Sequence, residues 1–175
     1  PESTSLQQIL AHLWDELHNA AADPAHDCHW PVLATVQCAP SHCSGPALPD
    51  ARTVVLRSAD RRAGNLSMHT DSVAAKCEQL QSQPVAMLTS YWQLLQLQLR
   101  IRGRVSQHHN DAIAAQAWSR LSDSSRQQSD GPHRFTVLHL RVSSIDWLNL
   151  ATRPHQRARF HRNNQPPAPD KPLFS

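Results

Sequence analysis

The chain has 175 residues, a formal net charge of +3 at neutral pH and 39% hydrophobic residues. This length fits one domain with a substantial core, and no apolar run reaches the roughly eighteen residues that a membrane-spanning helix needs. The positive charge is small and spread along the chain, which argues against a nucleic-acid-binding protein. The first residues show no basic and apolar leader, so we expect a cytoplasmic protein with reduced cysteines.

The N-terminal segment predicts an amphipathic helix over residues 5–20. Its apolar positions recur at intervals of three and four residues, as on one buried helix face. Asp23 and Pro24 then end the helix. The apolar positions are Leu6, Ile9, Leu10, Leu13, Trp14 and Leu17.

Six short β-strands are predicted further along the chain. The segment 97–105 alternates most clearly between apolar and polar residues, whereas residues 39–50 are rich in turn-forming residues and predict a loop. Short connections favour antiparallel pairing, and therefore a mainly β protein of the α+β class, a small closed or partly open barrel with peripheral helices. We expect one domain over residues 1–162 and a Pro-rich tail over 163–175. The predicted strands are 30–38, 52–58, 65–70, 85–92, 97–105 and 135–142.

Two further helices are predicted between the strands. Asp71 is expected to cap a helix over 72–82, with Val73, Cys77 and Leu80 on its buried face. A helix over 110–121 is expected to bury one apolar side, and residues 122–133 are expected to form a loop. That apolar side consists of Ile113, Ala117, Trp118 and Leu121.

The residues with the clearest chemical pattern lie between positions 52 and 76. An extended apolar run is enclosed by Arg52 and Arg57, and a hydroxyl, a carboxylate and a third cation follow at Thr70, Asp71 and Lys76. Backbone and hydroxyl groups suit a planar ring system, while cations and a helix N-terminus suit a phosphate. The pattern predicts a site for a phosphorylated planar cofactor.

This order of residues resembles the flavin-binding segment of the pyridoxamine 5'-phosphate oxidase-like family, in its shorter branch with a leading helix and a His-Thr-Asp motif. The resemblance extends over residues 30–160, and includes a Gln five residues before a strand glycine, Gly103, and an Arg-Phe pair that ends in Phe160. It implies a six-stranded antiparallel split β-barrel that binds FMN. The implied cofactor-binding residues are Arg52, Thr53, Val54, Val55, Leu56, Arg57, His69, Thr70, Ser72, Lys76, Gln98 and Arg159.

The resemblance also implies a homodimer with the cofactor site at the interface, where Arg159 would come from the other subunit. The implied function is FMN-dependent oxidation or reduction of a small molecule whose identity the sequence does not give. The alternative is a non-catalytic flavin- or haem-binding protein on the same fold. Flavin chemistry needs no protein nucleophile, so no catalytic residue is predicted.

Two departures from the family pattern affect these expectations. The stretch Ser72, Val73, Ala74, Ala75 replaces residues that supply extra phosphate ligands in the family, and one charge-assisted hydrogen bond is worth about 1.5–3 kcal/mol. We therefore expect weakened FMN binding. No Tyr-x3-Arg-x3-Ser is present, and His155-Gln-Arg157 reverses the order of the family's Arg-x-His pair. Oxidation of pyridoxamine phosphate itself is therefore not expected.

Neither a zinc site nor a nucleic-acid interface is expected. Three cysteines lie near histidines at positions 28–43, yet no C-x2-C or H-x3-H pair is present, so no zinc site is expected. Arg100, Arg102 and Arg104 share one strand face, but aromatic residues make up only 5% of the chain and none stands between these arginines. A nucleic-acid interface is therefore not expected.

Overall fold

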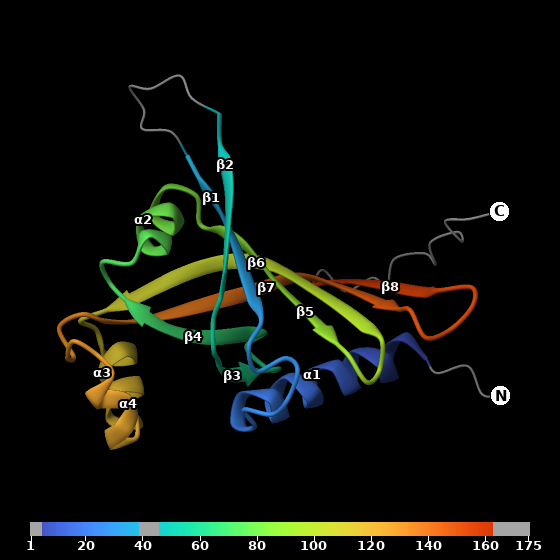
Figure 1. Ribbon diagram of the computed structural model, residues 1–175, viewed down its shortest axis with the longest axis horizontal. Coiled ribbons are helices and arrows are strands. Elements are labelled where there is room, and N and C mark those ends of the chain that lie inside the picture. The colour runs from blue at the N-terminus through green and yellow to red at the C-terminus, as the bar shows by residue number, and fades with distance from the viewer. Residues whose placement is uncertain (1–4, 39–45, 163–175) are drawn as a thin grey trace.

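The computed structural model describes residues 5–38 and 46–162, which form one eight-stranded antiparallel sheet with four helices at its margins (Figure 1). The predicted mainly β, α+β class is confirmed. The strands are β1 (Val32–Gln37), β2 (Leu48–Thr53), β3 (Leu56–Asp60), β4 (Asn65–Asp71), β5 (Val85–Trp92), β6 (Leu97–His109), β7 (Phe135–Asn149) and β8 (Gln156–His161).

The expectation of six strands is wrong in two places. The strand expected over 52–58 is interrupted at Val54 and Val55, and its two halves belong to β2 and β3. The strand expected over 135–142 continues to Asn149, and β8 follows it in the arginine-rich stretch. The first error arises because Val54 and Leu56 bond to Pro31 and His29 instead of to a neighbouring strand. The second arises because polar residues that point away from the core leave no apolar run by which a strand is recognised.

The strands pair in the order β2-β1-β5-β6-β7-β4-β3, with β8 also beside β7. The two ends of this order, β2 and β3, are joined by the chain itself through Val54 and Val55. At this link the Val54 N–H donates to Pro31 O and the Leu56 N–H to His29 O, both at 2.9 Å. The strands therefore curve into a split barrel whose hydrogen-bonded ring is not closed.

Strand β7 has two successive partners on one side. Its first half pairs with β4 through Phe135–Arg141, and its second half pairs with β8 through Ser144–Asn149. The register against β6 shifts between Arg102 and Gly103. A Cβ atom on Gly103 would lie 2.3 Å from Arg141 O, so only glycine fits this close approach.

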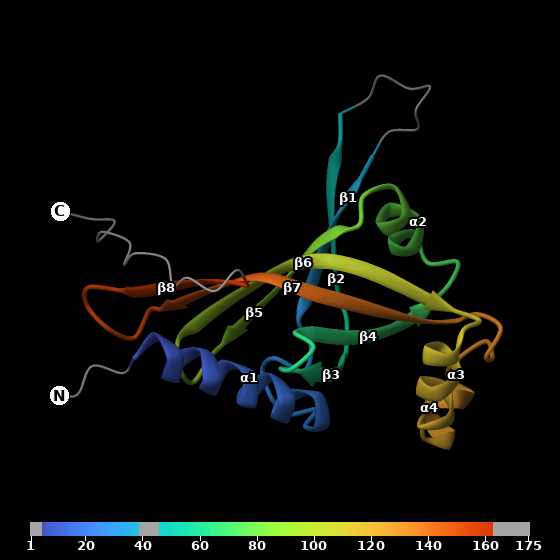
Figure 2. The same ribbon diagram turned by 180° about the vertical axis from the view of Figure 1, so that it is seen from behind.

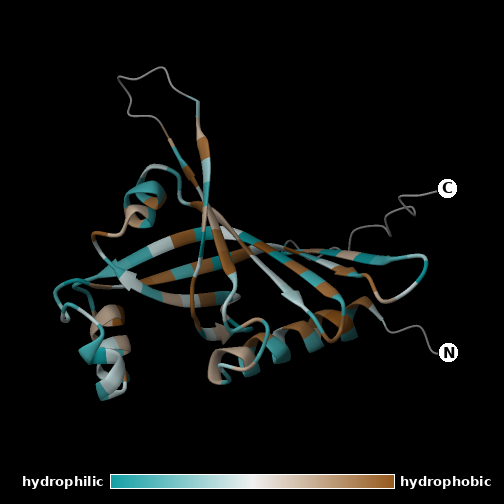
Figure 3. Cartoon of the chain, in the orientation of Figure 1, coloured by the Kyte–Doolittle hydropathy of each residue, from teal (hydrophilic) through white to brown (hydrophobic). Residues whose placement is uncertain are grey.

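Helix α1 (Leu6–Ala22) covers the open side of the barrel (Figure 2). Ser5 caps it with a reciprocal bond to Gln8, and its brown stripe in Figure 3 faces the sheet. Leu13 and Leu17 are only 1% exposed, and burying each leucine is worth about 1.5–3 kcal/mol. The expected helix over 5–20 is confirmed.

Helix α2 (Ala75–Ser82) begins later than expected, and its N-cap is Ala74 instead of Asp71. The Asp71 carboxylate accepts the Val73 N–H at 2.9 Å and pairs with Arg134 instead. Val73 is 70% exposed, contrary to expectation, whereas Cys77 and Leu80 are buried as expected. The carboxylate thus stabilises the turn before the helix.

Helices α3 (Ala112–Ser119) and α4 (Asp123–Gln127) lie together at one end of the sheet (Figure 1). Ile113 is 38% exposed instead of buried, and Ala114 takes the buried position. Helix α4 falls in the segment expected to be a loop, because five polar residues carry no apolar periodicity. Ser122 caps it by accepting the Ser125 N–H.

Within the described residues, no helix is both long and apolar enough to cross a membrane. The expected tail over 163–175 and residues 39–45 of the expected loop over 39–50 lie outside the described residues. The end of that expected loop is wrong, because β2 already begins at Leu48. The domain boundary at residue 162 therefore stays a prediction.

Candidate functional site

Three of the predicted site residues meet where α2 approaches β2 and β4; we call Arg52, Thr70 and Lys76 the α2 corner. The Lys76 ammonium donates to Thr70 Oγ1 at 2.8 Å. Burial lowers the pKa of Lys76, and the positive charge of Arg52 lowers it further, so the two cations are near enough to repel each other. Such a pair of cations suits a dianionic ligand.

Arg52 is held in a polar network that the sequence analysis missed. Its guanidinium forms an ion pair with Asp50 and donates to Thr35 Oγ1 at 2.5 Å and to Gln79 Oε1 at 3.0 Å. Thr35 in turn donates to Gln79 Oε1 at 2.6 Å, and the Gln79 amide donates to Asp50 at 2.8 Å. These bonds fix the direction of the Arg52 side chain before any ligand arrives.

Two carboxylates act on the cations of this corner. The hydrogen bond from Gln79 and the charge of Arg52 lower the pKa of Asp50, so its carboxylate is ionised at neutral pH and pairs with Arg52. The charge of Asp71 raises the pKa of Lys76, but this carboxylate also pairs with Arg134. The Lys76 ammonium forms no ion pair among the described residues and is therefore the group most available to an anion.

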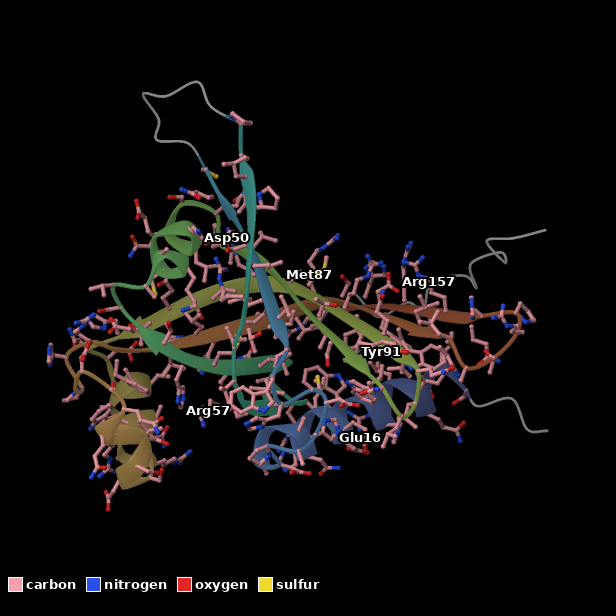
Figure 4. All side chains as sticks on the ribbon, in the orientation of Figure 1. Glu16, Asp50, Arg57, Met87, Tyr91 and Arg157 are labelled. Carbon is pink, nitrogen blue, oxygen red and sulfur yellow. The ribbon has the colours of Figure 1, made fainter. Side chains whose placement is uncertain are left out.

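A cavity of about 280 Å3 opens beside the corner and includes Thr70 in its wall. Arg57 lines it from the start of β3, where Figure 4 shows its side chain; burial lowers the pKa of Arg57. The opposite wall comes from the α3–α4 segment and offers hydroxyl and amide groups. Its lining residues there are Leu121, Ser125, Gln128, Ser129 and Asp130.

His69 in this cavity carries a buried ring nitrogen, Nδ1, with no hydrogen-bond partner among the described residues. Burial, followed by the charge of Arg57, lowers the pKa of His69 to about 4. The imidazole is therefore neutral at physiological pH. Its ring packs edge-on against Phe135 at 4.8 Å between centroids, which leaves the nitrogen fixed and able to bond a ligand.

Asp71 fixes one rim of the cavity. It accepts the Arg134 Nε–H at 3.1 Å, and Arg134 also pairs with Asp130 at 2.7 Å. The Val73 N–H is the main cause that lowers the pKa of Asp71, with Arg134 adding to it. This bridge ties β4 to the segment before β7.

Gln98 and Arg159 do not join the α2 corner within one protomer. Gln107 donates to Cys77 O at 2.9 Å, which places that end of β6 at α2. Gln98 precedes Gln107 by nine residues in the same strand, or about 30 Å along it. Figure 4 likewise shows Asp50 beside α2 and Arg157, a near neighbour of Arg159 on β8, toward the other end of the molecule.

At that other end, three arginines surround one carboxylate, a group we call the Asp146 cluster. Arg100, Arg157 and Arg159 approach Asp146 Oδ2 at 2.7, 2.5 and 3.2 Å. Burial alone would raise the pKa of Asp146, but hydrogen bonds from Arg157 and Arg100 lower it to about 2. The cluster lies on the sheet face that also carries Gln98.

The remaining predicted residues lie along the link between β2 and β3 or before α2. Thr53 is exposed and Val55 half-buried, whereas Val54 is buried and Leu56 is 0% exposed, so that the Leu56 side chain belongs to the core. Ser72 is half-buried, and its N–H donates to Arg134 O at 2.8 Å.

The sequence profile described as the pyridoxamine 5'-phosphate oxidase FMN-binding domain matches residues 11–109. The chain belongs to this family. FMN is therefore its cofactor, and the resemblance seen in the sequence is confirmed, together with the split-barrel fold.

Known members of the family give the extent of the likeness. The pyridoxine/pyridoxamine 5'-phosphate oxidase of Legionella pneumophila (strain Lens) is 34% identical over 148 residues, which cover 85% of this chain and 62% of that relative. This chain thus spans less than two thirds of the relative's length.

Two solved structures share the fold of this family member. A pyridoxamine 5'-phosphate oxidase-related, FMN-binding protein from Nostoc punctiforme superimposes with a TM-score of 0.73 at 24% identity, over 95% of this chain and 100% of that one. A haem-binding protein from Mycobacterium smegmatis gives a TM-score of 0.55 at 17% identity, over 83% and 57% of the two chains.

The residues present fit FMN. The α2 corner offers two cations and a hydroxyl to the phosphate of FMN. In the adjoining cavity, the unpartnered Nδ1 of His69 can bond a polar group of the ligand. By contrast, the described residues hold no cluster of His, Cys, Asp and Glu suited to a metal ion. His29 instead bonds Ala20 O at 2.6 Å from a buried position, while Cys43 lies outside the described residues.

Some functional residues carried a signal in the sequence and others did not. Lys76 and Gln79 lie three residues apart on a predicted helix and therefore share a face. Asp50 and Arg52 share a face of β2, but the sequence predicted a loop up to residue 50 and so did not indicate this pair. The partners of Asp146 depend on the register of three strands, for which the sequence offers no direct signal.

Proposed function

We propose that this chain is an FMN-dependent oxidoreductase that acts on a small molecule as a homodimer. The observation that supports this most is the meeting of Arg52, Thr70 and Lys76 at α2, next to a cavity with a buried, unpartnered nitrogen of His69. When bound, FMN supplies the electron-transfer chemistry. The protein's part is to bind, orient and exclude water.

Each group at the site has a definite task in this proposal. Lys76 and Arg52 neutralise the FMN phosphate, and the network of Asp50, Thr35 and Gln79 holds Arg52 in place for it. Neutral His69 offers one hydrogen bond, the direction of which depends on its tautomer. Arg57 attracts an anionic group of the substrate into the cavity.

We assign the substrate only to a class: a small planar molecule with one anionic group. The cavity of about 280 Å3 lies near the lower end of the range for small-molecule sites, and its wall mixes one arginine with serine hydroxyls. The name of the Legionella relative places a phosphorylated pyridine in this class, although this chain lacks that family's Tyr-x3-Arg-x3-Ser.

We further propose that Gln98 and Arg159 complete the site of a second copy. They lie together on the outer sheet face, since Gln98 is opposite Leu148 and Arg159 is opposite Asp146 across neighbouring strands. The distance of about 30 Å along β6 keeps Gln98 from its own α2 corner. In a dimer with a two-fold axis, Gln98 and Arg159 of each copy would reach the α2 corner of the other copy, so the dimer would contain two equivalent shared sites.

We place the protein in the cytoplasm. Cys28, Cys38 and Cys77 are free thiols, and Cys28 and Cys77 are buried. Burial raises the pKa of both buried thiols, which keeps them unreactive. Free thiols of this kind are usual in a reducing compartment.

Titration of the apo-protein with FMN, followed by quenching of flavin fluorescence, tests the cofactor site. We expect micromolar affinity, and a loss of about ten- to hundredfold in Lys76→Gln. Arg120→Gln changes an exposed arginine at the C-terminal cap of α3; it is the control and should bind like the unchanged protein. Equal affinity in both variants would overturn the assignment of the α2 corner.

Mixing two inactive variants tests the shared site. Lys76→Gln and Arg159→Gln, mixed in equal amounts and allowed to exchange subunits, should recover normal FMN affinity in about a quarter of the sites, because one site of each mixed dimer is intact. No recovery, together with a monomeric mass in sedimentation, would contradict the dimer.

Turnover decides between the oxidoreductase and the non-catalytic alternative. The oxidised, FMN-loaded protein is mixed with candidate substrates in the absence of oxygen and is then exposed to oxygen, while the visible spectrum is recorded. Substrate-dependent bleaching, which shows that the substrate has reduced the flavin, and recovery in oxygen support the oxidoreductase. A haem spectrum in freshly purified protein, or a flavin that no substrate reduces, supports the binding protein.

A further inference from the structure

A second basic site lies away from the cofactor residues, where β7 and β8 meet the turn between β3 and β4. Two adjoining cavities of about 230 and 320 Å3 share Val142, Ser143, His161 and Arg162 in their walls. None of the predicted cofactor residues lines either cavity. We call the two together the arginine groove, after the arginines that line it: Arg61, Arg62, Arg104, Arg141 and Arg162.

The charge of the arginine groove is uncompensated. No Asp or Glu is found among the described residues that line either cavity. Within residues 5–38 and 46–162, none of its five guanidinium groups forms an ion pair. The nearby Asp60 uses its carboxylate to accept the Ala63 N–H at 2.9 Å, within the turn itself.

Two of these arginines face each other directly. Arg104 of β6 and Arg141 of β7 are register partners in antiparallel strands, and like charges in that position destabilise a sheet. Both are exposed, so solvent screens part of the repulsion. An anion bound between them would remove the rest.

Arg162 is positioned in advance. Its guanidinium donates to Ala63 O at 3.0 Å and lies 3.3 Å from where a Cβ atom on Gly64 would be. Gly64 has a φ of +67°, so glycine both permits this turn and leaves room for the guanidinium. The turn that carries Arg61 and Arg62 is thereby fastened to the end of β8.

The floor of the smaller cavity is apolar and partly aromatic. Leu10 and Trp14 of α1 lie against it from below, and Phe160 of β8 completes it. Ser143 and Ser144 add hydroxyl groups at its edge. A floor of this kind suits a flat ring, whereas a bare inorganic ion would leave it uncovered.

We propose that the arginine groove is a second ligand site, which binds a small molecule that combines a phosphate group with a single aromatic ring. The arginines bind the phosphate and the Trp14 side of the cavity receives the ring. Cavities of this size favour a small ligand over a long polyanion, which would need an extended basic track. The site is independent of FMN binding.

Phenyl phosphate is the probe for this site, titrated by calorimetry into full-length protein saturated with FMN so that the α2 corner is occupied. We expect a Kd of about 0.1–1 mM from two charge-assisted hydrogen bonds. Phenol and inorganic phosphate, each carrying half of the recognition, should bind at least about tenfold more weakly. Heat from phenyl phosphate no larger than that from buffer would overturn the proposal.

Variants locate the binding. Arg104→Gln and Arg162→Gln should each weaken phenyl phosphate by about tenfold or more, while Arg120→Gln should leave it unchanged. Arg104→Gln should also raise the Tm of the ligand-free protein by about 1–3 °C, because it removes the facing charge. Phenyl phosphate should then raise the Tm of the unchanged protein more than that of this variant.

Three results would contradict the proposal. Affinity that is lost in Lys76→Gln but kept in both groove variants would place the probe in the cofactor site. Tight binding of heparin or an oligonucleotide that phenyl phosphate cannot displace would show a surface for polyanions instead. Equal affinity for phosphate and phenyl phosphate would show that the apolar floor takes no part.

Discussion

Arginine meets carboxylate in two regions of this molecule, and the two are built differently. At the α2 corner, Asp50 and Arg52 are joined by neutral groups of Thr35 and Gln79 between α2 and the strands β1 and β2. At the Asp146 cluster, three arginines approach one carboxylate on a face of the sheet. The corner lies beside a cavity, whereas we propose that the cluster faces the second copy of a homodimer.

The largest effect expected from this contrast concerns the corner. Arg52→Gln combined with Lys76→Gln removes both cations and should weaken FMN by about a thousandfold or more, which corresponds to about 4 kcal/mol. The measurement is the fluorescence titration, with circular dichroism to confirm the fold. Arg120→Gln combined with Arg153→Gln removes the same charge from exposed positions, and it should change the affinity less than about threefold.

Asp146→Asn tests the cluster. The neutral side chain removes the negative charge that three guanidinium groups contact, so the free energy of unfolding should fall by about 2 kcal/mol, less than for a fully buried pair because the cluster is partly exposed. Urea unfolding measures it. Asp123→Asn, whose carboxylate is 93% exposed and 3.6 Å from its single partner Arg126, should change stability by no more than about 0.5 kcal/mol.

A fall in pH should reduce the stability contributed by His69, in the cavity beside the α2 corner, before it affects the Asp146 cluster. The pKa of His69 is lowered to about 4 from an ordinary 6.5, so the unfolded chain binds a proton first and stability falls as the pH drops through that window. Between pH 7.5 and pH 5 the loss should be about 2 kcal/mol. His69→Gln should remove most of this slope, and the remainder should come from His139, whose pKa is also lowered by burial. Exposed His18→Gln should keep the slope.

The cluster should resist the same change in pH. The pKa of Asp146 is lowered to about 2 from 3.8, so its contribution is present above pH 4 and is lost only as the pH falls toward 2. A loss of stability that begins near pH 6 and is equally large in His69→Gln would show that the two regions do not differ in their response to pH.

The smallest effect concerns the orientation of Arg52. Thr35→Val keeps the shape of the side chain but removes the hydroxyl that bonds Arg52 and Gln79. Stability should fall by about 1 kcal/mol and FMN affinity by about three- to tenfold, with turnover at saturating FMN unchanged. Thr152→Val in the β7–β8 loop is the matched control. A lowered turnover at saturation would show that Thr35 does more than position Arg52.

The sequence predicted the local part of this architecture better than the non-local part. Lys76 meets Thr70 because a strand end and a helix start adjoin in the chain, which spacing alone reveals. The division of residues 52–58 into β2 and β3 depends on a bend in which Val54 and Leu56 bond to Pro31 and His29. Residues so distant in the chain give no periodic signal.

The same limit explains the two wrong helix details. Asp71 is a residue type that often caps helices, but its carboxylate pairs instead with Arg134, which lies just before the neighbouring strand β7. Val73, expected to be buried, is exposed because the helix starts two residues beyond it. In both cases a tertiary contact outweighed a local preference of the order of 1 kcal/mol.

The pairing of β7 with both β4 and β8 determines where insertions and deletions can be tolerated. A strand moved by a single residue turns every side chain to the opposite face. Since one uninterrupted strand serves both β4 and β8, deleting a residue anywhere within it would misalign the wall next to His69 and the Asp146 arginines together. Variation in length should therefore be tolerated between β7 and β8, where the chain leaves the sheet, and not within the strand itself.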